Sequence, residues 1–263
     1  MSDAWMPGAG RIWGTTDGGP LRGGAPRAVW QTLGADPRTV SAGSAARRLN
    51  QLGRACHLVW NPVQGDIVQV IPILRAGRLL GSPEDLSETA HPKPAADAGQ
   101  VAEVNTEGRL CVQIGVVAFA WDPFTAWPMT GLQQILEWLG SWGIPRQWPA
   151  GRPAPFPHGL TTLGDRRLWA RGGQFGASQV PGLTAAGPGA VDVDLLSGRA
   201  AQTRQLERTD HITARAGRVP AAAVALASER AADRQAAPAG MGDVYGYLGN
   251  DEAATAGAVS RVG

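Results

Sequence analysis

The sequence has little lysine, cysteine, histidine and tyrosine, and two of these shortages exclude a class of protein. Lys93 is the single lysine among 263 residues, the formal net charge is +2, and the arginines form no concentrated basic stripe. This argues against a nucleic-acid-binding surface. The two cysteines, Cys56 and Cys111, are too few for a disulfide framework, although one bridge between them stays open. Both stand in apolar runs, where a free cysteine behaves as a small buried hydrophobe.

Long hydrophobic runs are also missing. No stretch approaches the roughly 20 apolar residues of a membrane span, and no charged segment followed by a sustained apolar run marks a Sec signal peptide. We therefore expect synthesis in the cytoplasm without a signal peptide. The residue present in excess is tryptophan, with ten Trp against two Tyr and four Phe. Tryptophan fills large gaps in cores and presents a large flat ring to ligands.

Composition divides the chain into three parts. Residues 1–26 are rich in Gly and Pro without periodicity, which predicts an extended arm whose Trp5 and Trp13 anchor it to a surface. Residues 27–195 hold the periodic segments and predict one domain. Residues 196–263 are dominated by Ala, Gly and Arg and carry too little large apolar surface for an independent core, so we expect a docking tail.

The periodic segments of the middle part predict an α/β domain. They are strands over 27–32 and 110–120, a hairpin of 56–60 and 66–71, and helices over 41–53 and 128–145. The run 110–120 is apolar nearly throughout, as a central strand covered on both faces is. In the second helix, Thr130 with Gln133 matches a capping box, and Gly143 with Pro145 marks the end. The polar residues 81–100 predict a surface loop.

The clearest motif is the segment 171–189, RGGQFGASQVPGLTAAGPG. Its fragments SQVP and PG, together with the hairpin HLVWNP from His57 to Pro62, resemble the type 2 N-acetylmuramoyl-L-alanine amidases. That family shares its fold with peptidoglycan recognition proteins, and the hairpin is closest to forms from actinobacteria and their phages. The resemblance covers residues 25–195. It implies an amidase-like fold with a central mixed β-sheet flanked by helices.

The resemblance also implies a zinc site, whose positions are changed in this chain. In the family, the first strand ends in a His ligand, where Gln31 stands here. The family's closing loop, which the segment 171–189 resembles and whose name we use for it, supplies a His and an Asp, which are replaced here by Ala177 and Gly187. A glutamate near the groove is replaced by Gly115. A hydrolytic zinc site needs about three protein ligands, so we expect no metal, no cofactor and no catalysis of the family's kind.

Other groups of polar residues offer no clear replacement for this site. His158, Asp165, Asp192 and Asp194 have no ligand spacing that is specific for a metal. Histidines at 91 and 211 fall in the predicted loop and tail, and His57 is expected to be a hydrogen-bonded structural residue. Cys56 beside His57 is no catalytic dyad, because neighbours along a strand point to opposite faces.

These patterns favour a pseudoenzyme: a degenerate amidase-like domain that serves as a structural or interaction subunit of a large assembly. A phage particle or a phage-tail-like injection machine is the kind of assembly we expect, with other subunits bound by the arm and the tail. Two alternatives stay open. One is a peptidoglycan-binding module without catalysis, with Trp60, Asn61, Arg75 and Gln179 lining a groove. The other is an active amidase with altered metal ligands.

Overall fold

A computed structural model of the chain describes residues 3–14, 16–80 and 104–198. By their contacts, residues 1–207 and 208–263 form two separate units, and every described residue belongs to the first. The surface loop expected at 81–100, nearly all of the expected tail, and the histidines at 91 and 211 lie outside the described residues.

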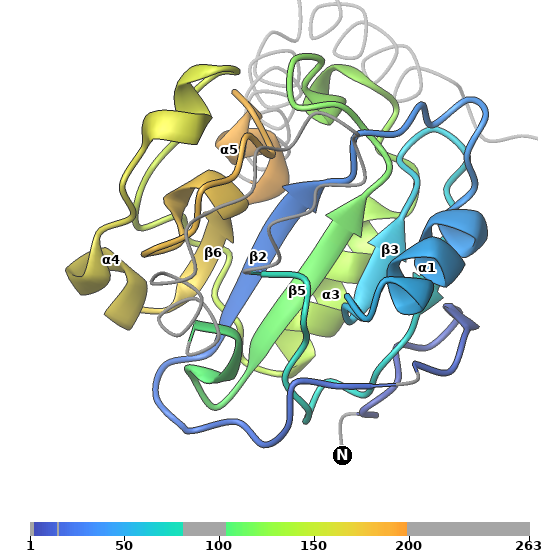
Figure 1. Cartoon of the computed structure of the whole chain (residues 1–263), viewed down its shortest axis with the longest axis horizontal. Helices are drawn as coiled ribbons and strands as arrows, with labels where there is room; N and C mark the ends of the chain where they lie inside the picture. Colours follow the sequence, from blue (N-terminus) through green and yellow to red (C-terminus); the bar gives the residue numbers. More distant parts are fainter. Residues whose placement is uncertain (1–2, 15, 81–103, 199–263) are drawn as a thin grey trace, which may run out of the picture. The chain divides into compact units, whose positions relative to one another are not determined.

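The described unit is a mixed α/β domain built on a six-stranded sheet, in the order β1-β4-β3-β5-β2-β6 (Figure 1). The strands are β1 (Gly10–Arg11), β2 (Arg27–Thr32), β3 (Leu58–Trp60), β4 (Ile67–Gln69), β5 (Cys111–Val116) and β6 (Gly173–Gly176). Every pairing is parallel except the hairpin of β3 with β4. The predicted strand over 27–32 and the predicted hairpin are confirmed. So is the central position of β5, which is buried along its whole length.

Helices cover both faces of this sheet (Figure 1). They are α1 (Ala42–Gln51), α3 (Leu132–Ser141), α4 (Arg166–Ala170) and α5 (Val193–Leu196), with 3₁₀ turns η2 (Phe124–Ala126), η3 (His158–Thr161) and η4 (Ala177–Gln179). Leu49 of α1 packs with Val59, whereas Ile135 of α3 packs with Trp30 and Ile114 on the other face. Within the described ranges, no helix is long and apolar enough to cross a membrane.

The start of α3 differs from the prediction. Gly131 is the N-cap residue, with φ of 88° and no side-chain hydrogen bond, so the predicted capping box of Thr130 and Gln133 is wrong. The Thr130 carbonyl accepts a hydrogen bond from the Trp60 indole at 2.8 Å instead. A tertiary contact thus replaces the local cap. The predicted end is confirmed, since Gly143 has φ of 73° and the amide of Ile144 donates to the carbonyl of Leu139.

The arm lies on the edge of the sheet over its described residues. β1 pairs with β4, and the side chain of Gln69 accepts from the amide of Met6 at 2.6 Å and donates to the carbonyl of Ala4 at 3.0 Å. Met6 is 2% exposed, whereas Trp13 is 73% exposed. Trp5 and Trp13 contact each other at 5.2 Å in an edge-to-face arrangement. The buried anchor of the arm is therefore Met6, and not the two tryptophans that the sequence suggested.

Both cysteines are buried and free. Cys56 packs in the cluster beneath α1, and Cys111 packs in a separate cluster with Val29 and Phe175. Burial raises the pKa of each thiol to about 12, so neither thiol is a ready nucleophile. The expectation of small buried hydrophobes is confirmed.

Candidate functional site

The four positions singled out by the resemblance meet at the carboxyl ends of β2, β5 and β6. Gln31 and Gly115 are partners in the parallel register of β2 and β5. Ala177 directly follows β6. Gly187 joins them from the closing loop, where its carbonyl accepts from the amide of Ser178 at 2.8 Å. This end of a parallel sheet is where α/β proteins commonly place functional residues.

The closing loop packs tightly against the end of β2 at this site. A Cβ atom at Gly187 would lie 2.4 Å from Oγ1 and 3.0 Å from the backbone nitrogen of Thr32. A Cβ atom at Gly115 would lie 3.1 Å from the side chain of Leu33. Gln31 and Ala177 are buried beside them. Side chains at positions 115 and 187 would therefore crowd Leu33 and Thr32.

The polar atoms left in the site are weak ligands. Gln31 Oε1 and Ser178 Oγ are buried and have no hydrogen-bond partner. An amide oxygen and a hydroxyl are neutral, whereas zinc sites in proteins use thiolate, imidazole and carboxylate groups. Among the described residues, no group of three or more His, Cys, Asp or Glu side chains is placed to hold a metal ion. The residues present do not fit a catalytic zinc.

Two acidic residues that sequence analysis considered for a metal site are helix caps instead. Asp165 accepts from the amide of Arg167 at 2.7 Å at the start of α4. Asp192 accepts from the amides of Asp194 and Leu195 at the start of α5. Carboxylates in these positions stabilise the first turn of a helix. Each carboxylate therefore caps the helix that it precedes.

The four candidate groove residues do not line one surface. Trp60 and Asn61 are fully buried, Gln179 is nearly so, and only Arg75 is exposed. Arg75 forms a two-pronged ion pair with Asp17, with both distances 2.9 Å. In this structure, the groove that the sequence suggested is replaced by interior packing.

The buried amides of this set organise loops. Asn61 Nδ2 donates to the carbonyls of Pro37 and Val40, and its Oδ1 accepts from two amides of its own turn. Gln179 Nε2 donates to the carbonyls of Ala150 and Gly151, and its Oε1 accepts from the amide of Gly176. Each amide is satisfied within the chain, so neither side chain is available to a ligand.

The expectation that His57 is a hydrogen-bonded structural residue is confirmed, but the buried polar network around it on β5 was missed by sequence analysis. His57 Nδ1 accepts from the amide of Gln113 at 3.0 Å, and Nε2 donates to the carbonyl of Arg75 at 2.8 Å. Gln113 Nε2 donates to Asn105 Oδ1 at 2.6 Å, and Oε1 accepts from the amide of Leu79 at 2.8 Å. Burial lowers the pKa of His57 to about 4. The only sign of this network in the sequence was Gln113, a polar residue inside the apolar run of β5.

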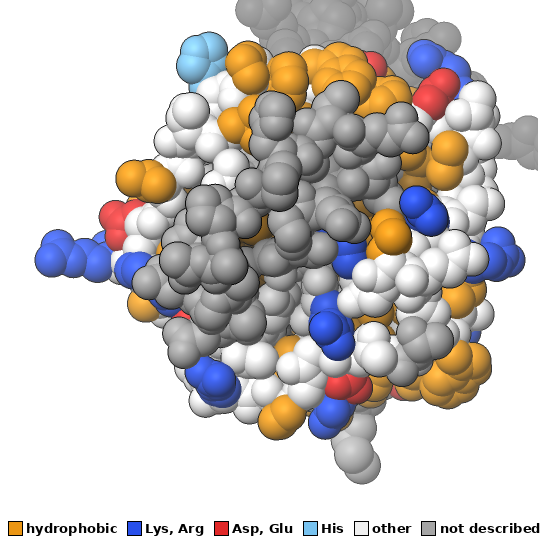
Figure 2. Space-filling view, viewed as in Figure 1, with side chains coloured by type: hydrophobic (Ala, Val, Ile, Leu, Met, Phe, Trp, Pro, Cys, Tyr) orange, Lys and Arg blue, Asp and Glu red, His pale blue; other side chains and the backbone are white. Residues whose placement is uncertain are grey.

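An exposed group of apolar side chains beside the site was also missed. We define the aromatic shelf as Phe119, Trp121 and Phe156. The rings of Phe119 and Trp121 stack at 4.4 Å, and Trp121 meets Phe156 edge to face at 5.8 Å. Figure 2 shows hydrophobic side chains gathered at the end of the molecule where β2 and β5 end. The excess of tryptophan was the available signal.

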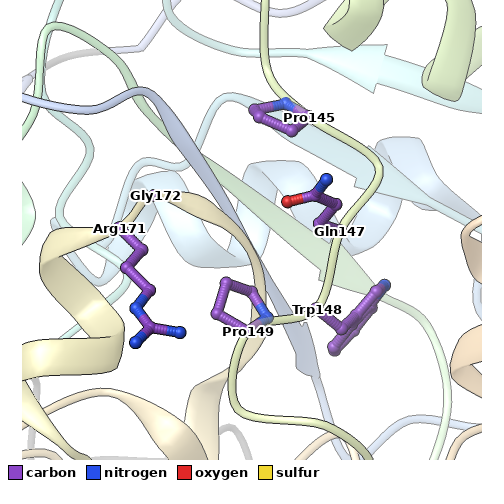
Figure 3. Close-up of a pocket in the computed structure, with 6 residues that line it drawn as sticks. All are labelled: Pro145, Gln147, Trp148, Pro149, Arg171 and Gly172. Carbon is purple, nitrogen blue, oxygen red and sulfur yellow. The ribbon is translucent and has the colours of Figure 1, made fainter.

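A cavity of about 320 Å³ lies at the other end of β6 (Figure 3). Its lining residues are Pro145, Gln147, Trp148, Pro149, Arg171 and Gly172. Gly172 precedes β6, whereas Ala177 follows that strand, so the cavity and the filled site are separated by the length of β6. The lining contains one guanidinium and one amide and no acid, histidine or thiol. It holds no pair of groups for acid and base catalysis.

Comparisons with known proteins give one coarse similarity. No family model matches the chain, and no curated protein matches it. A solved structure that is similar in fold is that of the Staphylococcus aureus hydrolase AmiA in complex with its ligand. The TM-score is 0.36 and the sequence identity is 8%, and the match covers 65% of this chain and 65% of that one. This is a coarse similarity of fold alone.

Proposed function

We propose that this chain is a non-catalytic, amidase-like module that acts as a structural or interaction subunit of a large assembly, of the kind a phage particle represents. The observation that supports the proposal most directly is the packing of the closing loop at Gly187. This loop lies so close to Thr32 that a ligating side chain at 187 has no room. A site that is crowded by Thr32 in this way favours a role in assembly over hydrolysis.

The alternative of an amidase with altered ligands has less support. Catalytic zinc needs three ligands and one open position for water. The polar side chains at this position are the amide of Gln31 and the hydroxyls of Thr32 and Ser178, and Gln31 Oε1 and Ser178 Oγ are buried. Thr32, Ala177 and Ser178 are buried with them, which disfavours binding of water and a peptide bond at that position.

The first test of the proposal combines metal content with activity. We expect the purified full-length protein to hold zinc far below one equivalent after dialysis against zinc, and to release no stem peptides from purified cell walls. An active amidase assayed in parallel shows that the substrate is competent. One equivalent of zinc together with peptide release would overturn the proposal.

The packing itself is tested by a substitution. Gly187→Asp restores the carboxylate of the family, but we expect it to lower the free energy of unfolding by about 2 kcal/mol or more, because the new side chain overpacks the loop and is buried without a partner. Thr184→Asp is the matched control, since it adds the same charge at an exposed position of the same loop. We expect a change of about 0.5 kcal/mol or less there. Equal stability of the two variants in denaturant unfolding would contradict the tight packing.

A further inference from the structure

We propose that the cavity beside Arg171 is a binding site for a carboxylate that is attached to a small apolar group. A free organic acid and the C-terminal end of a peptide both have this chemistry. The cavity lies before β6, and the site around Ala177 lies after that strand. Binding in the cavity therefore does not depend on the loss of zinc chemistry, and the two proposals are tested by different measurements.

The cavity has two polar side chains that the protein itself does not use. Arg171 comes from the end of α4, and Gln147 comes from the segment 145–149 (Figure 3). Among the described residues, neither side chain has a hydrogen bond or an ion pair. A guanidinium binds a carboxylate through two parallel hydrogen bonds, and an amide nitrogen supplies further donors. The available donors therefore match a ligand with negatively charged oxygen atoms.

The charge around α4 also favours an anion. The helix and its C-cap residue carry Arg166, Arg167 and Arg171. Glu107 already pairs with Arg166, and Asp165 is the N-cap residue of the helix. In the part of the chain that the structure describes, neither Arg167 nor Arg171 has an ion pair. Two guanidinium groups are thus left without a neutralising partner, and they attract a negatively charged ligand.

The apolar part of the lining is held in place before a ligand binds. It consists of Pro145, Trp148 and Pro149. Trp148 is 6% exposed and belongs to the hydrophobic core. The segment is also fixed to β6, because the amide of Gln174 donates to the carbonyl of Gln147 at 2.8 Å. This bond uses backbone atoms only and leaves the Gln147 side chain free. A rigid lining binds an apolar group with little loss of conformational entropy.

The size and the lining of the cavity limit what the ligand can be. Its volume of about 320 Å³ is at the lower end of the range for small-molecule sites, which is about 300–1,000 Å³. This favours a ligand with one carboxylate and one apolar group over a large cofactor. The lining contains no acid, so a cationic ligand would face Arg171 without a compensating charge.

The test uses isothermal titration calorimetry on the full-length chain with N-acetylphenylalanine and with its uncharged amide. The two probes share one apolar body and differ only in the carboxylate. We expect the acid to bind, and the amide to bind about tenfold or more weakly, because it lacks the charge-assisted hydrogen bonds to Arg171. A tripeptide that ends in phenylalanine separates the two sources. Tighter binding of the tripeptide assigns the cavity to a peptide end, whereas equal or weaker binding assigns it to a free acid.

Two variants locate the binding. Arg171→Gln removes the charge from the cavity, and we expect it to weaken binding of the acid about tenfold or more. Arg167→Gln is the matched control, because it removes the same charge from the same helix but lies outside the lining. We expect a change of about threefold or less there, since exposed charges are screened by solvent and salt. Circular dichroism confirms that each variant is folded.

Three results would contradict this site. The first is that neither the acid nor the tripeptide binds up to its solubility limit. The second is that the acid and its amide bind equally. The third is that Arg167→Gln weakens binding as much as Arg171→Gln, which would show a general attraction to positive charge. None of these results changes the zinc content or the packing at Gly187, so they leave the non-catalytic proposal standing.

Discussion

At the scale of single residues, burial decides what His57 does. Its ring is fully buried, and both nitrogens are bonded to backbone groups of the chain. Because the amide of Gln113 must donate to Nδ1, the proton of the neutral ring is on Nε2. Protonation would remove the acceptor for that amide and place a charge in an apolar interior. Both effects favour the neutral ring.

The pH dependence of stability follows from this ring. The pKa of His57 is about 4 in the folded chain, below its ordinary value of 6.5, so the unfolded chain binds the proton first as the pH falls. Stability from this group is complete above about pH 6.5 and is lost between about pH 6.5 and 4. We expect a loss of about 3 kcal/mol across this range, measured by denaturant unfolding at each pH.

Two variants isolate this effect. His57→Gln cannot ionise, so we expect it to be less stable at pH 7 but to lack the loss between pH 6.5 and 4. His158→Gln removes an exposed histidine and keeps the wild-type profile. Asp17, whose pKa is lowered mainly by its hydrogen bond with Arg75, affects stability only at lower pH. A wild-type profile that is flat down to pH 4.5 would contradict a neutral buried His57.

Residue type alone predicted the wrong surroundings for several candidates. Trp60 and Asn61 were chosen because tryptophan and amide side chains bind ligands. The backbone of a turn can also make the hydrogen bonds of an amide side chain, and it does so for Asn61. Nothing local separates these cases, since the partners of Asn61 at Pro37 and Val40 are over 20 residues away in the sequence. The shelf was missed for the opposite reason. Trp121 contacts Phe156, which is distant in the sequence and which only the fold brings near.

At the scale of elements, α1 depends on a residue of the hairpin. Ser41 caps the helix from its own N-terminus by accepting from the amide of Ser44 at 3.2 Å. Asp66, just before β4, accepts from the amide of Ala42 at 2.7 Å and brings a negative charge to the first turn. The helix is thereby tied to the sheet at the point where its amides lack internal partners.

Asp66→Ala should therefore destabilise the fold. We expect a loss of about 1 kcal/mol, because a helix amide loses its acceptor and the dipole loses its charge. The loss is limited, since Oδ1 of Asp66 is buried without a partner in the wild type. Asp66→Asn keeps an acceptor of the same shape and should lose less. The free energy of unfolding measures both, and equal losses would show that the charge, and not the hydrogen bond, acts on α1.

Elements with local patterns were predicted well, and elements made by tertiary contacts were not. The strand over 27–32 and the helix over 41–53 follow from periodicity that the sequence contains. The start of α3 does not follow from periodicity, because its N-cap residue Gly131 lies against Ile67 of the hairpin. β1 is two residues long and exists only through its pairing with β4. A strand of that length leaves no periodic signal.

At the scale of the whole molecule, parallel register assembles the site from segments far apart in sequence. Residues 31, 115, 177 and 187 come together because β2 pairs with both β5 and β6. The resemblance to a known family identified these positions, and periodicity did not. The core that holds them draws on residues from Met6 to Leu196 in the described part of the chain. This core is the reason to expect that residues 1–207 fold alone.

Removing residues 208–263 tests the tail as a docking element. We expect the shortened chain to keep its thermal midpoint within about 2 °C, because a shift of that size corresponds to less than about 1 kcal/mol in a domain of this length. In the cells that make the protein, we expect the full chain to sediment with large particles and the shortened chain to remain at the top of the gradient. If both chains enter particles equally, the tail is not the docking element. The arm would then be the remaining candidate, although its Met6 is buried in the core. A shortened chain that does not fold would instead show that the two units depend on each other for stability.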